Sequence, residues 1–234
     1  MELSIASWNS TGSAKHKCDW FNEFMSSMDI KLANLQETFR AGKAPNLYFK
    51  NKFSKHRNHT TPASRKDPLS AGRPKGGLVQ LWDKDIQISI ENIPTSNFRV
   101  QAQLIRNRNF QALWINTYHP TDKPNNDISE LEQVLVEVGD ILDNHPNSEV
   151  IWAGDLNYNT QRVTTATSRI QEWLDQRELI SVNKLIGIDY TYTHTDHVTS
   201  SILDHIIVSP NLLDKIVEGG VHHSGTCPSG HDPI

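Results

Sequence analysis

Apolar and polar positions along the chain form runs that predict a mixed α/β protein. A strand is expected at residues 3–8, which end on polar Asn9, and another at residues 30–35, which end on Gln36 and Glu37. Between these strands, apolar residues recur at the spacing of a buried helix face, at Cys18, Phe21, Met25 and Met28. Polar residues directly after apolar strands indicate a site at the strand ends, where a packed sheet holds them rigidly.

Further strands are predicted in two groups. The first group could form an antiparallel meander and comprises residues 78–82, 86–90, 98–105 and 110–118. The second group comprises residues 150–153, 202–208 and 216–221. Residues 38–75 are polar and basic, so we expect long surface loops there around a short strand at 47–53.

Two more helices are expected in the second half of the chain. Asp127 with Glu130 resembles a capping box, and the apolar residues that follow share one helical face, at Ile128, Leu131, Leu135, Val138 and Leu142. The spacing of Ile170, Trp173 and Leu174 predicts the other helix. With 234 residues, 36% of them hydrophobic, we expect a single domain, residues 1–234, with one substantial core.

Charge is strongly segregated along the chain. Between positions 50 and 75 there are eight basic residues and one acid, Asp67, which gives 8 − 1 = +7 and leaves −4 − 7 = −11 elsewhere. The basic residues are Lys50, Lys52, Lys55, Arg57, Arg65, Lys66, Arg73 and Lys75. We predict that this segment contacts nucleic-acid phosphates, and a solvated loop is the alternative.

Membrane and secretory classes are disfavoured. No stretch approaches the apolar length of a membrane helix, and the N-terminus lacks the regions of a signal peptide. The 2 cysteines are too few for a disulfide framework or a Cys-rich zinc site. We therefore expect a soluble intracellular protein.

The strongest chemical signal lies where the strand at residues 150–153 ends. Asp155 and Asn157 follow it two positions apart, so a carboxylate and an amide can project into one cleft. An ordinary turn is the alternative, because Asp and Asn near glycine are common turn residues.

A second signal is Asp204, an acid within an otherwise apolar strand. A buried carboxylate is costly unless it is paired or hydrogen-bonded, so Asp204 needs a partner if it faces inward. His231, near the end of the chain, is our candidate, since the carboxylate would orient its ring and leave the other nitrogen for substrate. An edge strand with a solvated Asp204 is the alternative.

Taken together, these motifs resemble the exonuclease/endonuclease/phosphatase superfamily in order and spacing across almost the whole chain. The matching segments are Trp8-Asn9, Leu35-Gln36-Glu37, Gly76-Gly77, Asn116-Thr117-Tyr118, Gly154-Asp155-Leu156-Asn157, the Asp204 strand and Ser229-Gly230-His231. The resemblance implies a four-layered α/β sandwich, in which two mostly antiparallel sheets are flanked by helices and the site lies at one end.

The resemblance also implies roles for individual residues in a phosphodiesterase that uses Mg²⁺, with Mn²⁺ as the alternative. Glu37 binds the metal and Asn9 supports it, while Tyr118 contacts the scissile phosphate. Asp155 positions or deprotonates the attacking water, and Asn157 holds that water or the phosphate. The Asp204 and His231 pair supplies another donor to the phosphate.

Within the superfamily, the Ser201–Ser209 strand motif resembles the endonuclease domain of a non-LTR (LINE-type) retrotransposon. That resemblance implies a monomeric domain that nicks double-stranded DNA in the nucleus, and whose polypeptide continues into a reverse transcriptase. Alternatives are an abasic-site endonuclease, an inositol polyphosphate phosphatase and an inactive nucleic-acid-binding module.

One position departs from the family pattern. Related proteins usually have an aspartate directly before the terminal histidine, whereas this chain has Gly230. The missing carboxylate is expected to weaken metal binding, so Gly230→Asp is expected to increase nicking. A harmless substitution is the alternative.

Overall fold

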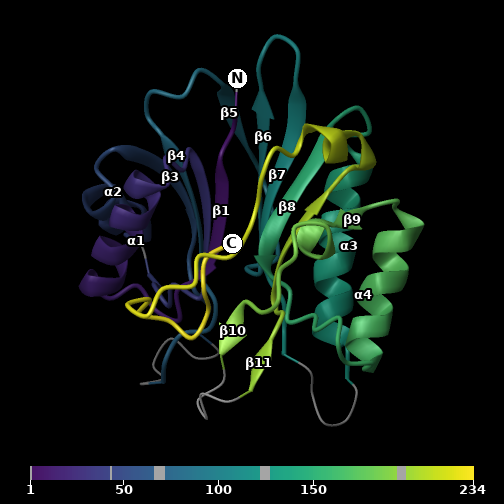
Figure 1. The fold of residues 1–234 in the computed structure, drawn as a ribbon. Coiled ribbons are helices and arrows are strands. Elements are labelled where there is room, and N and C mark those ends of the chain that lie inside the picture. Colours follow the sequence, from purple (N-terminus) through teal and green to yellow (C-terminus); the bar gives the residue numbers. More distant parts are fainter. Residues whose placement is uncertain (1, 43, 66–71, 122–126, 194–198) are drawn as a thin grey trace.

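Two β-sheets lie face to face in the computed structural model, and helices cover both outer faces (Figure 1). The structure describes residues 2–42, 44–65, 72–121, 127–193 and 199–234. This arrangement is the four-layered α/β sandwich that the sequence predicts. Among the described residues, no helix has the length and apolar character needed to cross a membrane.

The first sheet has the strand order β1-β2-β4-β3. Its strands are β1 (Ile5–Asn9), β2 (Leu32–Gln36), β3 (His56–Thr61) and β4 (Leu78–Asp83). Helix α1 (Lys15–Ser27) joins β1 to β2, which are parallel, and the other pairs are antiparallel. Together with α2 (Pro45–Lys52), α1 covers the outer face, where Phe21, Met25 and Phe49 pack against Trp8 and Val79.

The second sheet has the order β5-β6-β7-β8-β12-β9. Its strands are β5 (Ser89–Ile93), β6 (Val100–Arg106), β7 (Gln111–Tyr118), β8 (Glu149–Asp155), β9 (Ile180–Ser181) and β12 (Asp204–Val208). Only β7 and β8 pair in parallel, across α3 (Ser129–Asp143). Helices α3 and α4 (Thr165–Gln176) bury Leu135, Val138 and Trp173 against this sheet.

Four short elements complete the described fold. Strands β10 (Tyr192–Thr193) and β11 (Ser200–Ser201) form a separate antiparallel pair, which lies below both sheets in Figure 1. Two 3-10 helices, η1 (Val182–Lys184) and η2 (Pro210–Lys215), flank β12 along the chain.

Residues 47–53, predicted as a strand, form most of helix α2 instead. Pro45 occupies the first turn, where its missing N–H costs nothing, and Phe49 and Phe53 are buried four residues apart on one helical face. The strand of this region comes later, as β3, whose sequence HRNHTT has almost no apolar residue. Its edge position explains why an apolar run could not reveal it.

Three other expectations are corrected. Strand β4 belongs to the first sheet, so the meander has only β5, β6 and β7, and residues 216–221 form no strand. Helix α3 lacks the predicted capping box, because the Asp127 carboxylate accepts from the Ser129 N–H while Glu130 pairs with Arg99. A capping box does occur at α4, between Thr164 and Thr167.

Buried amide side chains link the two sheets near the end that carries the predicted site. Asn34 Nδ2 donates to the carbonyls of Ile115 and Ala153, at 3.0 and 2.9 Å, and Gln36 Nε2 donates to Asn116 Oδ1 at 2.8 Å. A hydrogen bond needs a defined geometry, whereas apolar contact does not. These links therefore fix the strand ends of one sheet relative to those of the other.

Candidate active site

The predicted site residues meet at one end of the sandwich because several strands end or begin there. Asn9 ends β1, Tyr118 ends β7 and Asp155 ends β8, whereas Asp204 begins β12. Asp155 is in register with Tyr118 on one side and with Asp204 on the other. The C-terminal segment adds His231, which forms a bridge with Tyr192.

Asn9 connects the two carboxylates nearest to β1. Its Nδ2 donates to Glu37 Oε2 at 3.1 Å and to Asp155 Oδ2 at 2.8 Å, and its side chain is fully buried. The Asn9 Oδ1 accepts from the Thr11 N–H at 2.9 Å, which fixes the amide orientation. Glu37 and Asp155 therefore face each other across one amide nitrogen.

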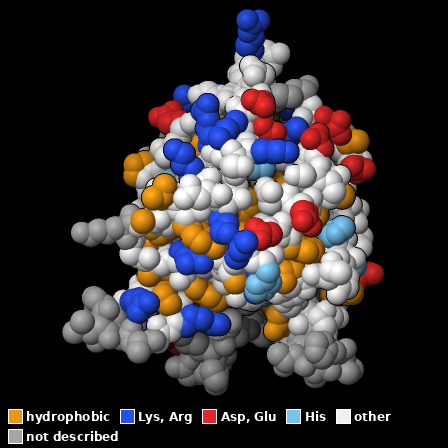
Figure 2. All heavy atoms as spheres, turned by 90° about the vertical axis from the view of Figure 1, so that its left-hand side faces the viewer, with side chains coloured by type: hydrophobic (Ala, Val, Ile, Leu, Met, Phe, Trp, Pro, Cys, Tyr) orange, Lys and Arg blue, Asp and Glu red, His pale blue; other side chains and the backbone are white. Residues whose placement is uncertain are grey.

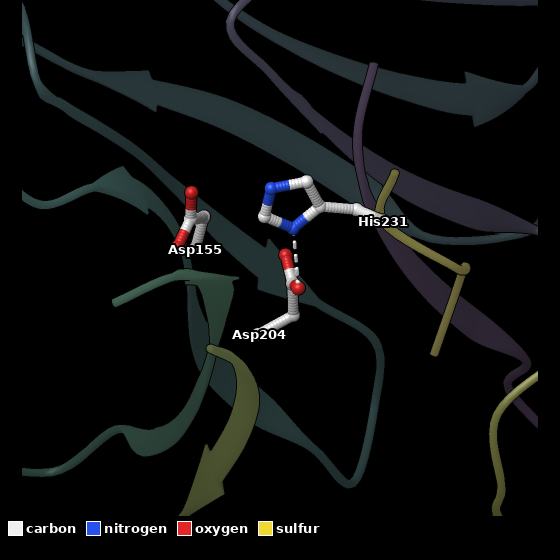
Figure 3. Close-up of side chains that lie close together, drawn as sticks. All are labelled: Asp155, Asp204 and His231. Atoms are coloured by element: carbon white, nitrogen blue, oxygen red, sulfur yellow. Dashed lines mark hydrogen bonds and ion pairs between the residues drawn. The ribbon is translucent and has the colours of Figure 1, made fainter. Parts of the chain in front are cut away.

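Asp204 and His231 form the predicted pair. The His231 Nδ1 donates to Asp204 Oδ2 at 2.7 Å, and both side chains are buried. Figure 3 shows the imidazole above Asp204 and beside Asp155, with Nδ1 toward Asp204 and the other ring nitrogen turned away from it. Burial alone would lower the pKa of His231, but the negative charges of Asp204, Asp155 and Glu37 outweigh it and raise that pKa to about 9.

The surroundings of Asp155 raise the pKa of its carboxyl group. Burial and the neighbouring Asp204 carboxylate raise the pKa of Asp155 to about 7, although His231 and the Asn9 amide oppose this shift. The Asn157 backbone N–H donates to Asp155 Oδ1 at 3.0 Å, while Asn157 Nδ2 is anchored on the His119 carbonyl at 2.9 Å. Asn157 thus orients Asp155 directly.

Tyr118 lies beside Glu37 with its hydroxyl held neutral. Burial and the nearby Glu37 carboxylate, to which it is hydrogen-bonded, raise the pKa of Tyr118. A neutral phenol can donate a hydrogen bond to an anion.

Behind Tyr118 sits Arg99, which sequence reasoning missed. Its guanidinium carbon lies 5.0 Å from the Tyr118 ring centre, and its Nη2 pairs with Glu130 at 2.9 Å. Its signal in the sequence was a cation at the second position of the strand predicted at residues 98–105.

The donor set fits a hard divalent cation, which prefers oxygen ligands. Glu37 and Asp155 bring two carboxylates together, and Asp204 Oδ1 has no hydrogen-bond partner among the described residues. Asp155, Asp204 and His231 also offer ligand atoms within 4.8 Å of one another. Because a protonated His231 favours an anion over a cation, Glu37, with Asn9 beside it, is the residue that could hold the cation, and Asp155 faces it across the Asn9 amide.

The local backbone explains why Gly154 precedes Asp155. A Cβ at position 154 would lie 2.2 Å from the Thr117 carbonyl oxygen of the adjacent strand, so only glycine fits. Glu37 and Asn157 have positive φ angles of 50° and 48°, which are uncommon for residues with a side chain. The first observation shows that β8 approaches β7 closely beside the site, and the second that the chain turns sharply at Glu37 and Asn157.

The basic segment is divided between the two ends of the first sheet. Strand β3 pairs His56 with Asp83 and Thr61 with Leu78, so Lys55 and Arg57 lie at the end away from the site. Helix α2, which carries Lys50 and Lys52, ends toward that same far end, because β3 begins there. Figure 2 shows Lys and Arg side chains spread over the face that α1 and α2 cover.

Three predicted basic residues lie at the site end of this sheet. Lys75 pairs with Ser64 just before Gly76, and the Arg73 guanidinium carbon lies 4.1 Å from the Phe39 ring centre, two residues after Glu37. Arg65 follows Ser64 directly, and Lys66 lies outside the described residues. The site end therefore offers Arg65, Arg73 and Lys75 to a polyanion.

His119 and His205 point away from the site, as the alternation of strand side chains predicts. His205 Nε2 contacts the Tyr158 carbonyl at 2.6 Å, and neither ring nitrogen of His119 has a partner among the described residues. Burial lowers the pKa of His119 to about 3 and that of His205 to about 4. Both rings are therefore neutral in the folded protein.

These two histidines contribute stability that is lost in acid. Their folded pKa values lie below the unfolded value near 6.5, so their contribution is complete above pH 6.5 and is lost as the pH falls toward 3 to 4. By pH 5 each histidine should cost about 2 kcal/mol, whereas the raised pKa values of Asp155 and His231 act in the opposite direction. The share of one histidine is therefore the change that its substitution makes in the stability difference between pH 7.5 and pH 5, measured by urea unfolding.

His119→Phe should make the protein about 2 kcal/mol more stable at pH 5, relative to pH 7.5, than the wild type is, since the buried titrating ring disappears. His16, an exposed histidine of α1, supplies the matched control, and His16→Phe should leave the difference as in the wild type. An unchanged pH dependence in His119→Phe would contradict the assignment.

The fold and the residues at its strand ends define a protein of the exonuclease/endonuclease/phosphatase superfamily. A family model described as endonuclease-reverse transcriptase matches residues 112–234, more than half of the chain. The chain belongs to this family, which confirms the superfamily and the retrotransposon-type endonuclease predicted from the sequence. A comparison with curated proteins gave no match.

Solved structures share the fold at low sequence identity. The AP endonuclease LMAP from Leishmania major is 14% identical with a TM-score of 0.79, over 99% of this chain and 86% of that one. The endonuclease domain of TRAS1, a telomere-specific non-LTR retrotransposon, is 15% identical with a TM-score of 0.71, over 99% and 95%. An AP endonuclease from Archaeoglobus fulgidus is 16% identical with a TM-score of 0.73, over 99% and 97%.

Proposed function

We propose that this chain is a Mg²⁺-dependent DNA endonuclease that nicks target DNA in the nucleus to prime reverse transcription by the same, longer polypeptide. The observation that carries the proposal is the site itself: in a chain of the endonuclease-reverse transcriptase family, Asn9, Glu37, Asp155, Asp204 and His231 converge at one strand edge. The likeness to the TRAS1 endonuclease domain supports the retrotransposon setting.

The reaction is hydrolysis of a phosphodiester. A bond forms between a water oxygen and phosphorus, and the bond from phosphorus to the 3′ oxygen breaks, so that the 3′ oxygen takes up a proton. The product is a 3′-hydroxyl, which a polymerase can extend. A divalent cation held by Glu37, with Asn9 supporting it, would offset the charge that develops on the phosphate.

Asp155 orients the attacking water and accepts its proton. A base works best when its pKa lies near the operating pH, and the pKa of Asp155 is raised to about 7. Asn157 and Asn9 hold the Asp155 carboxylate from two sides, at 3.0 and 2.8 Å, so its position does not depend on the substrate.

His231 and Tyr118 recognise the phosphate. Asp204 holds the Nδ1 side of the His231 ring, which leaves Nε2–H to donate to a phosphate oxygen. The Tyr118 hydroxyl, kept neutral by burial, is a second donor beside Glu37. Donors fixed before substrate arrives stabilise developing negative charge without reorganisation.

DNA binding should depend on salt through the basic residues at the site end. Substituting Arg65, Arg73 and Lys75 together by glutamine should reduce the slope of log affinity against log salt by roughly 2 to 3, at about 0.9 for each phosphate that is no longer neutralised. Fluorescence anisotropy with a labelled duplex at several salt concentrations would measure this slope.

The matched control for that measurement is Lys55→Gln/Arg57→Gln. These two residues lie at the far end of β3, roughly 15 Å from the site end of the strand. The control should leave the slope nearly unchanged. If both variants reduced the slope equally, the phosphate contacts would not be concentrated at the site end.

A duplex cleavage assay tests the choice of substrate. An intact duplex and the same duplex with one abasic site would be incubated with Mg²⁺ or with EDTA. We expect Mg²⁺-dependent cleavage of the intact duplex that leaves a 3′-hydroxyl, which extension by a polymerase detects. Cleavage confined to the abasic duplex would replace the proposal with an abasic-site endonuclease.

A further inference from the structure

The position of Gly230 is filled by an aromatic ring from another segment. A Cβ at position 230 would lie 3.0 Å from Tyr192 Cε2 and 3.3 Å from the Thr193 carbonyl oxygen. Gly230 is not among the glycines with positive φ, so its backbone does not require glycine. A side chain at position 230 would press on the Tyr192 ring, which would have to move by a few tenths of an ångström.

The Tyr192 ring also packs against His231, the histidine that pairs with Asp204. The ring centres of Tyr192 and His231 are 4.5 Å apart, with an angle of 48° between the planes. Aromatic pairs at this separation attract each other, and a cationic ring over an aromatic one gains further. Tyr192 therefore covers a face of the His231 imidazole.

Backbone hydrogen bonds hold Tyr192 in place. Strand β10 is tied to the C-terminal segment on both sides of Tyr192, by Thr193 N–H to the Gly230 carbonyl at 2.9 Å and by Asp232 N–H to the Thr191 carbonyl at 2.8 Å. The buried Thr191 Oγ1 also accepts from the backbone N–H of Asp204 at 3.0 Å. Residues 191–193 are thus hydrogen-bonded both to the segment that carries His231 and to Asp204.

We propose that Tyr192 is a positioning residue for His231, and that the absence of a side chain at Gly230 leaves room for the Tyr192 ring. The ring restricts rotation of the imidazole and shields the His231–Asp204 hydrogen bond from water. Aspartate at position 230 would bring a Cβ against the Tyr192 ring and disturb its packing on His231, so Gly230→Asp should lower the rate of nicking. This outcome is the reverse of the increase expected from the sequence.

Catalytic consequences of this proposal rest on the proposed endonuclease function. Tyr192→Ala should lower kcat for nicking by about 10- to 100-fold with KM close to wild type, since a misplacement of about 1 Å has effects of this size. Tyr192→Phe keeps the ring and should restore most of the rate. Gly230→Ala should lower kcat in the wild type but add little in a Tyr192→Ala background, because the ring it displaces is already gone.

An NMR measurement tests the same contact without relying on activity. The His231 Nδ1–H, bonded to Asp204 at 2.7 Å, should give a downfield proton signal protected from exchange with water. The signal should persist in Tyr192→Phe and vanish in Tyr192→Ala, with both variants folded by circular dichroism. Persistence in Tyr192→Ala, or independent effects of Tyr192→Ala and Gly230→Ala on kcat, would overturn the proposal. If the wild type fails to nick any DNA, the proposed function fails while the NMR comparison still decides the contact.

Discussion

Replacing His231 by glutamine should lower kcat for nicking by about 100- to 1000-fold, the cost of removing one preorganised donor to a developing negative charge. The side chain is buried, its Nδ1 is engaged by Asp204 at 2.7 Å, and its pKa is raised to about 9, so it stands ready as a charged donor. Single-turnover cleavage of a labelled duplex would measure the decrease.

Asp204→Asn should also lower kcat for nicking, because His231 would lose the carboxylate that orients its ring and stabilises its charge. The double variant should be hardly worse than His231→Gln alone, since residues that act as a unit are not additive. His223, an exposed histidine of the same C-terminal segment, provides the control, and His223→Gln should cleave close to the wild-type rate. Effects that multiply in the double variant would show that the pair does not act as one unit.

Glu37→Gln should raise the Mg²⁺ concentration needed for half-maximal nicking by at least about 10- to 100-fold. Substituting a residue that only hydrogen-bonds to a metal ligand already has an effect of this size. Glutamine keeps the shape and one oxygen but removes the negative charge beside Asn9 and Tyr118. Added Mg²⁺ should therefore restore part of the rate. Calorimetric titration with Mn²⁺ would show the weakened binding directly, without DNA.

The control for this substitution is Glu23→Gln, at an exposed position of α1. It should leave both the Mg²⁺ midpoint and the Mn²⁺ affinity unchanged. A Glu37→Gln variant with the wild-type midpoint would remove Glu37 from the metal site and leave the Asp155, Asp204 and His231 cluster as the alternative.

Much of the site could be predicted because the sequence signals concern single strands. Asp155 directly follows a buried run, so it could be placed at a strand end from spacing alone. Asp204 was expected within the strand at 202–208, and the structure places it at the start of β12. A buried acid needs a partner, which pointed to His231, and the structure shows that hydrogen bond. The roles of these residues in catalysis remain predictions.

Other features depend on contacts between distant segments, which no local pattern records. Tyr192 reaches His231 only because β10 pairs with the C-terminal segment, and Arg99 reaches Tyr118 because β6 and β7 pair side by side. Helix α2 was mistaken for a strand, because its buried residues are few and its surface is polar. The amide links between the sheets were unforeseen, since the sequence of one strand does not show which group of the other sheet Asn34 or Gln36 will meet.

Nicking of supercoiled plasmid by the wild type and by Asp155→Asn tests the central claim most directly. Asp155 receives the Asn9 amide and the Asn157 N–H, and asparagine keeps its shape without its charge. We predict that the wild type relaxes the plasmid with Mg²⁺ and not with EDTA, that Asp155→Asn leaves it supercoiled, and that Asp175→Asn, at an exposed position of α4, cleaves like the wild type. Equal nicking by Asp155→Asn, or no Mg²⁺-dependent nicking by the wild type, would contradict the account.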